Sequence, residues 1–149
     1  MRFRVPIAYL CGCVVLALVD RSAPAAPVAI DHGRYALTVE TVMPNLEENL
    51  RYATIHENRC LDGGAADALF PLLGHQSFAG CHLEDGVMDG DQRRYSLRCQ
   101  NPAAATGTAR VTITPVVLRG VLEIRMGGKN MTLSQRVAGT RLGDCPAVQ

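Results

Sequence analysis

The stretch "CHLEDGVMDGDQRRYSLRC", residues 81–99, has a cysteine at each end and a turn signal at its centre. Its middle, "DGD", combines Asp and Gly, residue types that favour tight turns. Side chains on a strand alternate between two faces, so folding the stretch about Gly90 brings both cysteines to one face. The pattern therefore predicts an antiparallel hairpin closed by a disulfide. The pairs expected on the shared face are Cys81–Cys99, Leu83–Leu97 and Asp85–Tyr95.

The acidic residues of this hairpin do not match a calcium loop, which needs Asp or Asn at positions 1, 3 and 5. A loop that starts at Asp89 has Arg93 at position 5, and a loop that starts at Asp85 has Val87 at position 3. Residues 26–149 also lack the C-x₂-C and H-x₃-H spacings of zinc sites and the C-x-x-C dithiol of redox proteins. We therefore predict no metal site and no cofactor.

The first 25 residues have the features of a secretory signal peptide. Two arginines within the first four residues precede a thirteen-residue apolar run at 7–19. Small residues then predict cleavage between Ala25 and Ala26. The run falls short of the roughly 20 residues that span a bilayer, and no later segment is long and apolar enough. We expect residues 26–149 to be exported to the periplasm or envelope of a Gram-negative bacterium.

A second processing route is open. The sequence "LCGC", Leu10 to Cys13, partly resembles a bacterial lipobox, in which the cysteine becomes the lipid-bearing N-terminus. The apolar run before Cys13 is short for this route, and it continues beyond that cysteine.

Cleavage after residue 25 would leave one domain of 124 residues, a size that can fold on its own core. It removes three of the 15 basic and one of the 14 acidic side chains, so 12 basic and 13 acidic ones remain. A nearly neutral chain lacks the concentrated basic surface that nucleic acids require. We expect no nucleic-acid partner.

Four cysteines remain after processing, and an even number in an exported chain predicts two disulfides. The hairpin favours Cys81 with Cys99, which leaves Cys60 to pair with Cys145. The alternative joins Cys60 to Cys81 around the segment between them, with Cys99 bonded to Cys145.

The rest of the chain alternates β-rich segments with turn residues and has no βαβ rhythm. Short links between successive strands favour an antiparallel meander. Residues 65–73 are mostly helix formers, but Pro71 restricts them to a short or broken helix. We therefore predict a mainly β fold, an antiparallel meander sheet or partial barrel with one short helix and two disulfides. The expected strands are 34–42, 51–60, 77–85, 93–99, 107–114, 117–126 and 131–141.

No catalytic constellation stands out. The serines lack a G-x-S-x-G setting, and neighbouring carboxylates are adjacent in sequence rather than facing. Each of His56, His75 and His82 is best explained as a polar strand or loop residue. We predict no catalytic residues and a protein that is not an enzyme.

The order of these features resembles the DUF3617 family of bacterial envelope proteins. The resemblance covers nearly all of residues 26–149, and its most specific parts are the cysteine spacing and the ending. The family often has Gly-x-Trp near the mature start, where this chain has Gly33-Arg34-Tyr35. The resemblance implies export, a β-rich domain and paired cysteines, and it brings no catalytic residues. The matching segments are "RCLDGGAADALFPLL", "GCHLEDGVMDGDQRRYSLRC", "GTARVTI", "GVLEIRM" and "MTLSQRVAGTRLGDC".

Three functions are consistent with the sequence. The first is a binding module that holds a small apolar ligand or a lipid against a concave sheet. The second is an envelope protein that binds another protein through a strand edge or the Arg-rich hairpin. The third is a hydrolase that no motif reveals. For the first function, the residues that could line the site are Met88, Met126, Met131 and the run Val116–Leu118, although core packing explains them better.

Overall fold

The computed structural model describes residues 30–48, 51–127 and 131–146. The predicted signal peptide, its cleavage site and the alternative lipobox at 10–13 lie outside the described residues. In the described part of the chain, no helix is long and apolar enough to cross a membrane.

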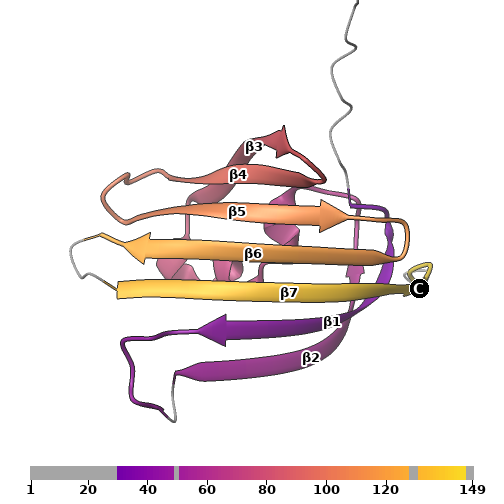
Figure 1. The fold of residues 1–149 in the computed structure, drawn as a ribbon, viewed down its shortest axis with the longest axis horizontal. Helices are drawn as coiled ribbons and strands as arrows, with labels where there is room; N and C mark the ends of the chain where they lie inside the picture. Colours follow the sequence, from indigo (N-terminus) through magenta and orange to yellow (C-terminus); the bar gives the residue numbers. More distant parts are fainter. Residues whose placement is uncertain (1–29, 49–50, 128–130, 147–149) are drawn as a thin grey trace, which may run out of the picture.

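The described residues form one antiparallel sheet of seven strands (Figure 1). Its spatial order is β2-β1-β7-β6-β5-β4-β3, and it does not close into a barrel. The predicted mainly β, antiparallel class is therefore confirmed, as an open sheet. The strands are β1 (Gly33–Val42), β2 (Tyr52–Leu61), β3 (Cys81–Asp89), β4 (Gln92–Cys99), β5 (Ala105–Ile113), β6 (Val117–Met126) and β7 (Met131–Gly143).

Five consecutive strands, β3 to β7, form the predicted meander, and β1 lies beside β7. The first strand therefore pairs with the last, in continuous register from Tyr35–Arg141 to Val42–Ser134 and with a register shift between Arg34 and Tyr35. Because β2 and β3 form opposite edges of the sheet, the chain between them must cross its whole width. We call this crossing segment, residues 62–80, the strap.

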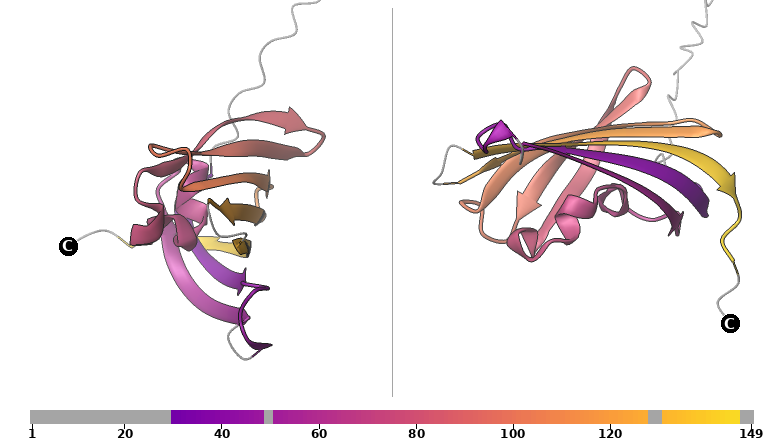
Figure 2. Two further views of the ribbon diagram at one scale, coloured as in Figure 1. Left: turned by 90° about the vertical axis from the view of Figure 1, so that its left-hand side faces the viewer. Right: turned by 90° about the horizontal axis from the view of Figure 1, so that it is seen from below.

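The strap consists of three 3₁₀ turns rather than the single short helix expected over 65–73. Pro71 starts the second turn, where its missing N–H does no harm, and so divides the helix formers on either side. The strap covers one face of the sheet, which we call the inner face, and leaves the other, the outer face, uncovered (Figure 2). The turns are η2 (Ala66–Leu69), η3 (Pro71–Gly74) and η4 (Gln76–Phe78).

Strand β6 shows how the sequence produces these two faces. Leu118, Leu122 and Ile124 point inward and are at most 2% exposed, whereas Arg119 and Glu123 between them are exposed. The period of two places every second residue under the strap. Burying these side chains against the strap stabilises the fold by roughly 1.5–3 kcal/mol each.

Polar side chains fasten the strap to the sheet. Gln135 of β7 is 3% exposed, and its Oε1 accepts a hydrogen bond from the backbone N–H of Leu72 at 3.2 Å. Its Nε2 donates to Oγ1 of Thr41 at 3.0 Å. Near the other edge, Oδ1 of Asp67 accepts from the N–H of Leu83 at 2.7 Å. These bonds satisfy polar groups that would otherwise be buried without partners.

Both ends of the strap are also held covalently. Cys60, just before it, is bonded to Cys145, and Cys81, just after it, is bonded to Cys99. The structure thus has the pairing that the hairpin pattern favoured, not the alternative one.

The β3–β4 hairpin has the predicted register near its base, where Cys81 faces Cys99. The register shifts between Glu84 and Val87, so the expected pairing of Asp85 with Tyr95 does not form. Gly86 lies in this irregular part, and a Cβ there would lie 2.1 Å from the carbonyl oxygen of Arg94. A side chain would prevent this close approach. The strand expected over 77–85 begins at Cys81, because η4 occupies the residues before it.

Candidate functional site

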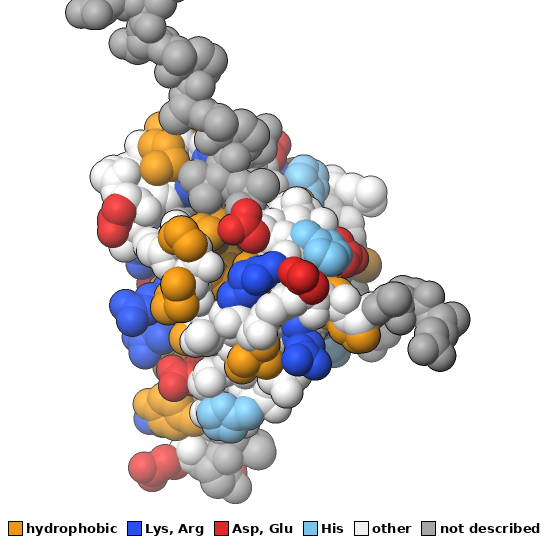
Figure 3. All heavy atoms as spheres, turned by 90° about the vertical axis from the view of Figure 1, so that its right-hand side faces the viewer, with side chains coloured by type: hydrophobic (Ala, Val, Ile, Leu, Met, Phe, Trp, Pro, Cys, Tyr) orange, Lys and Arg blue, Asp and Glu red, His pale blue; other side chains and the backbone are white. Residues whose placement is uncertain are grey.

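The outer face carries polar and small side chains because strands alternate in burial. In β5, β6 and β7 the outward positions are exposed or half-buried, and the strap does not reach them. Figure 3 views the molecule from one end, with charged and hydrophobic side chains interspersed along the outer face at the left. The outward residues of these strands are Thr106, Thr108, Arg110, Thr112, Arg119, Val121, Glu123, Arg125, Thr132, Ser134, Arg136, Ala138 and Thr140.

Three hollows follow one another along this face, and together we call them the trough. We name them the polar, central and distal hollows, in their order along the strands. The polar and central hollows are neighbours, because Thr38, Arg119 and Ala138 line both. From Val117 to Arg125 the trough is about 27 Å long at a strand rise of roughly 3.4 Å per residue. The polar hollow has a volume of about 540 Å³, and its lining includes Thr38, His56, Asn58, Arg119 and Thr140. The central hollow has a volume of about 240 Å³, and its lining includes Glu40, Arg119, Val121, Arg136 and Ala138. The distal hollow has a volume of about 590 Å³, and its lining includes Val42, Pro44, Thr108, Arg125 and Ser134.

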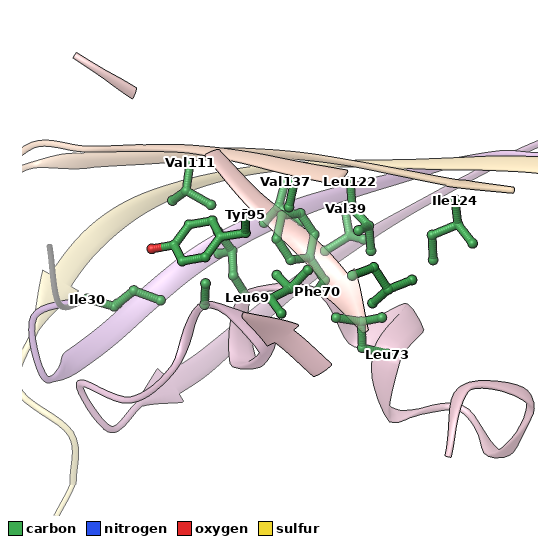
Figure 4. Close-up of a cluster of buried hydrophobic side chains, with 14 of the residues drawn as sticks. Ile30, Val39, Leu69, Phe70, Leu73, Tyr95, Val111, Leu122, Ile124 and Val137 are labelled. Atoms are coloured by element: carbon green, nitrogen blue, oxygen red, sulfur yellow. The ribbon is translucent and has the colours of Figure 1, made fainter. Parts of the chain in front are cut away.

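The inner face has a different character because the molecule's own side chains fill it. Figure 4 shows Leu69, Phe70 and Leu73 of the strap against the inward residues of the strands. Leu69 and Phe70 are at most 1% exposed. They approach β6 at Gly120, where a Cβ would lie 2.7 Å from Cδ2 of Leu69 and 2.8 Å from Cζ of Phe70. Glycine at this position lets the strap lie directly on the sheet.

Arginines of the outer face fall into two groups. Those of β4 and β5 are paired, because Arg98 lies 2.9 Å from Glu84 and Arg110 lies 3.2 Å from Glu123. A third such ion pair joins Arg94 to Asp89. By contrast, within the described part of the chain the arginines along the trough make no ion pair and no hydrogen bond. These are Arg119, Arg125 and Arg136.

Tyr35 is the one described group whose pKa is clearly shifted, and it lies on the inner face near the start of β1. Burial raises the pKa of its hydroxyl above the ordinary value of 10.0, the charge of Asp31 adds to the rise, and Arg141 opposes it. The hydroxyl donates a hydrogen bond to the carbonyl oxygen of Asp31 at 3.0 Å. Through this hydrogen bond the hydroxyl joins β1 to the residues just before it.

The residues expected to line an apolar site do not come together. Leu118 is 1% exposed in the core, whereas Val116 is 60% exposed in the turn before β6. Met126 and Met131 face each other at the β6–β7 turn, and Met88 is 40% exposed on the hairpin. The inner face therefore does not form the expected ligand surface, because the strap fills it. Of the predicted lining residues, Val117 alone borders one of the three trough hollows.

The histidines also lie apart. Nδ1 of His56 is 3.1 Å from Oγ1 of Thr38, and Nδ1 of His75 accepts a hydrogen bond from the N–H of Ser77. His82 is exposed on β3. The described residues contain no group of three metal-binding side chains.

Sequence reasoning missed the trough. The alternation in "RGVLEIRM" already marks Arg119, Val121, Glu123 and Arg125 as one face of a strand. What it does not show is that Arg136 of β7 joins them, because that requires the register between the two strands.

An open sheet with one face covered by its own strap and the other hollowed defines a class: a small, disulfide-stabilised protein built on a single antiparallel sheet. Within that class, the chain belongs to the DUF3617 family, described as a protein of unknown function, whose family model matches residues 30–145. No curated protein and no solved structure matches the chain significantly. The family membership assigns no function, which is therefore argued from the outer face.

Proposed function

We propose that this protein is an exported, non-enzymatic binding module that holds an apolar or lipid ligand along the trough. One observation carries the proposal: the hollows follow one another on the sheet face that the strap leaves open. Two of them have the volume of ordinary small-molecule sites, which measure about 300–1,000 Å³. In this proposal the ligand lies on the outer face, away from the predicted lining residues other than Val117.

The lining of the trough suits a ligand with an apolar part. Val121 and Ala138 form the floor of the central hollow, and Val42 and Pro44 border the distal one. An apolar ligand that covers these side chains gains about 25 cal/mol for each Å² of apolar surface removed from water. The threonines and arginines around them supply hydrogen-bond donors for the polar part of such a molecule.

Export is supported by the signal-peptide pattern at 1–25 and by the two disulfides, which persist in oxidising compartments. The periplasm or envelope of a Gram-negative bacterium is the compartment we propose. An intact denatured mass that corresponds to Ala26–Gln149 less four hydrogens is the expected result. A start at Cys13 with an added diacylglycerol would replace this proposal with lipoprotein processing.

Native mass spectrometry of the protein isolated from the bacterial envelope tests the binding module. We expect the native mass to exceed the denatured mass by one small-molecule increment. Ala138 is exposed and lines two hollows, so Ala138→Trp should abolish the increment without unfolding the protein. His82→Trp, at an exposed position of the edge strand β3 that borders none of the three hollows, is the matched control and should retain it. The absence of an increment in the unmodified protein would overturn the proposal.

A second candidate, binding of another envelope protein, is favoured by the edge strand β2. All ten of its residues pair in register with β1, and Tyr52 and Ile55 are 65% and 57% exposed. The opposite edge, β3, is interrupted between Glu84 and Val87, a feature that discourages strand addition. A discrete stoichiometric partner, cross-linked in envelope extracts and lost in Ile55→Asp, would favour this function over the first.

A further inference from the structure

The centre of the trough brings two arginines together on neighbouring strands. Arg119 of β6 faces Ala138 of β7, and Arg136 of β7 faces Val121 of β6. Both arginines point to the outer face, so they are diagonal neighbours across the β6–β7 ladder. Residues in this relation lie about 7–8 Å apart, within reach of long side chains. A single group bound between them can therefore contact both guanidinium groups.

The charge at this point is not balanced by the protein. Glu40 of β1 faces Arg136 and also lines the central hollow, but it makes no ion pair with either arginine. One carboxylate beside two guanidinium groups leaves a net charge of +1. The contrast with Arg98 and Arg110, each within 3.2 Å of a carboxylate, shows that acidic partners are supplied elsewhere on the same face.

The surroundings of the pair favour a group with two or more oxygen atoms. Guanidinium groups bind phosphate oxygens through charge-assisted hydrogen bonds, often two at a time. The central hollow of about 240 Å³ has Val121 and Ala138 between the arginines, so an apolar part of the ligand can lie beside the bound group. The distal hollow, with Val42 and Pro44, lies next along the strands, since its Glu123 and Ser134 are two residues from Val121 and Arg136 of the central hollow.

We propose that Arg119 and Arg136 together bind the phosphate of a phosphorylated lipid whose acyl chain runs along the distal hollow. This inference rests on the proposed function, because it assigns the ligand class and its orientation within the same trough. The phosphate lies between the two guanidinium groups in the central hollow. The chain then covers Val42 and Pro44 in place of water.

Titration calorimetry on the exported protein with palmitoyl lysophosphatidic acid tests this assignment, below the concentration at which the lipid forms micelles. Monopalmitoylglycerol, which has the same chain without phosphate, and inorganic phosphate are the comparison probes. We expect one lysophosphatidic acid per protein and at least tenfold weaker binding of each comparison probe. Arg119→Gln and Arg136→Gln should each weaken lysophosphatidic acid binding about 10- to 30-fold, as expected for loss of a charge-assisted hydrogen bond.

Arg34→Gln is the matched control, since Arg34 is another exposed arginine without an ion pair among the described residues and borders none of the three hollows. Its binding should change less than twofold. All three substitutions are at exposed positions, and unchanged thermal unfolding would show that each variant folds. An equal loss in all three variants would overturn the arginine-pair site in favour of general charge attraction.

The remaining outcomes separate this inference from the proposed function. Equal affinity for monopalmitoylglycerol would overturn the phosphate site and leave an apolar-ligand module standing. Inorganic phosphate that binds as tightly as the lipid would overturn the lipid part and indicate a free anion as ligand. If no probe binds while the native protein still carries a small-molecule increment, the ligand class proposed here is wrong and the trough remains the binding site.

Discussion

The two faces of this sheet are made by the same strands, yet the strap covers one face and solvent contacts the other. On the inner face, Leu118, Leu122 and Ile124 of β6 are covered by the strap and contribute to the core. On the outer face, Arg119 and Val121 of the same strand border hollows that open to solvent. The difference shows that the fold is stabilised from one side only. The other side is free to carry residues selected for purposes other than folding.

The largest effect should come from removing the bond that holds the start of the strap. The Cys60–Cys145 disulfide joins residues 85 positions apart. In the chain-entropy model, the Cys60→Ala/Cys145→Ala variant loses about 4.5 kcal/mol of unfolding free energy, enough to unfold many small domains. Urea unfolding measures this loss.

The Cys81→Ala/Cys99→Ala variant is the natural comparison, because its disulfide spans 18 positions. The same model gives about 3 kcal/mol for it. If this second variant proves the less stable of the two, loop closure does not govern the contribution of these disulfides.

The next largest loss of unfolding free energy should come from adding a side chain on the inner face of β6. Gly120→Val places carbon atoms where Leu69 and Phe70 already lie, at 2.7 and 2.8 Å from the new Cβ. Overpacking of this kind costs about 3 kcal/mol. The adjacent outward substitution Val121→Thr should change the unfolding free energy by less than about 0.5 kcal/mol. Similar losses for the two variants, measured by denaturant unfolding, would contradict the distinction between the faces.

The hydrogen bonds that fasten the strap should contribute less to the unfolding free energy. Gln135→Leu removes the acceptor for the N–H of Leu72 and leaves that half-buried donor without its partner. The expected loss is about 2 kcal/mol of unfolding free energy. Arg136→Gln, one residue later and on the outer face, should be neutral within about 0.5 kcal/mol. Faster amide exchange at Leu72 in Gln135→Leu, but not in Arg136→Gln, would confirm that the strap loosens.

The smallest effect concerns pH. Because the pKa of Tyr35 is raised in the folded protein, its contribution to stability is complete below about pH 10, where tyrosine of the unfolded chain is also neutral. It is lost progressively as pH rises through the raised pKa. We expect the unfolding free energies of the unmodified protein and Tyr35→Phe to converge above pH 10. Parallel pH profiles for the two proteins would show that Tyr35 titrates normally.

Much of the fold follows from local patterns. The hairpin closed by Cys81 and Cys99 was predictable because turn residues and the period of two specify register over a short distance. The shift after Glu84 was not, since nothing local distinguishes one extra residue from continued pairing. Likewise, helix formers around Pro71 indicated a short helical segment without showing that it would form three 3₁₀ turns across the sheet.

The candidate site was less accessible to sequence reasoning. Methionines at 88, 126 and 131 attracted attention as flexible apolar side chains, but the trough is made of threonine, alanine, valine and arginine. Arg119 and Arg136 are 17 positions apart and become neighbours only through the β6–β7 register. Polar residues at outward strand positions look like ordinary surface until pairing shows which of them share a hollow.

The sequence by itself determined that this is a β-rich chain with paired cysteines, because strand alternation and turn chemistry act between residues close together in the chain. Only the tertiary structure decided that β1 lies beside β7, that the strap covers one face, and that the other face bears a trough. These features depend on contacts between residues far apart in sequence. Such contacts form because burying Leu69 and Phe70 against Gly120 lowers the free energy of the whole molecule, and no local pattern records that gain.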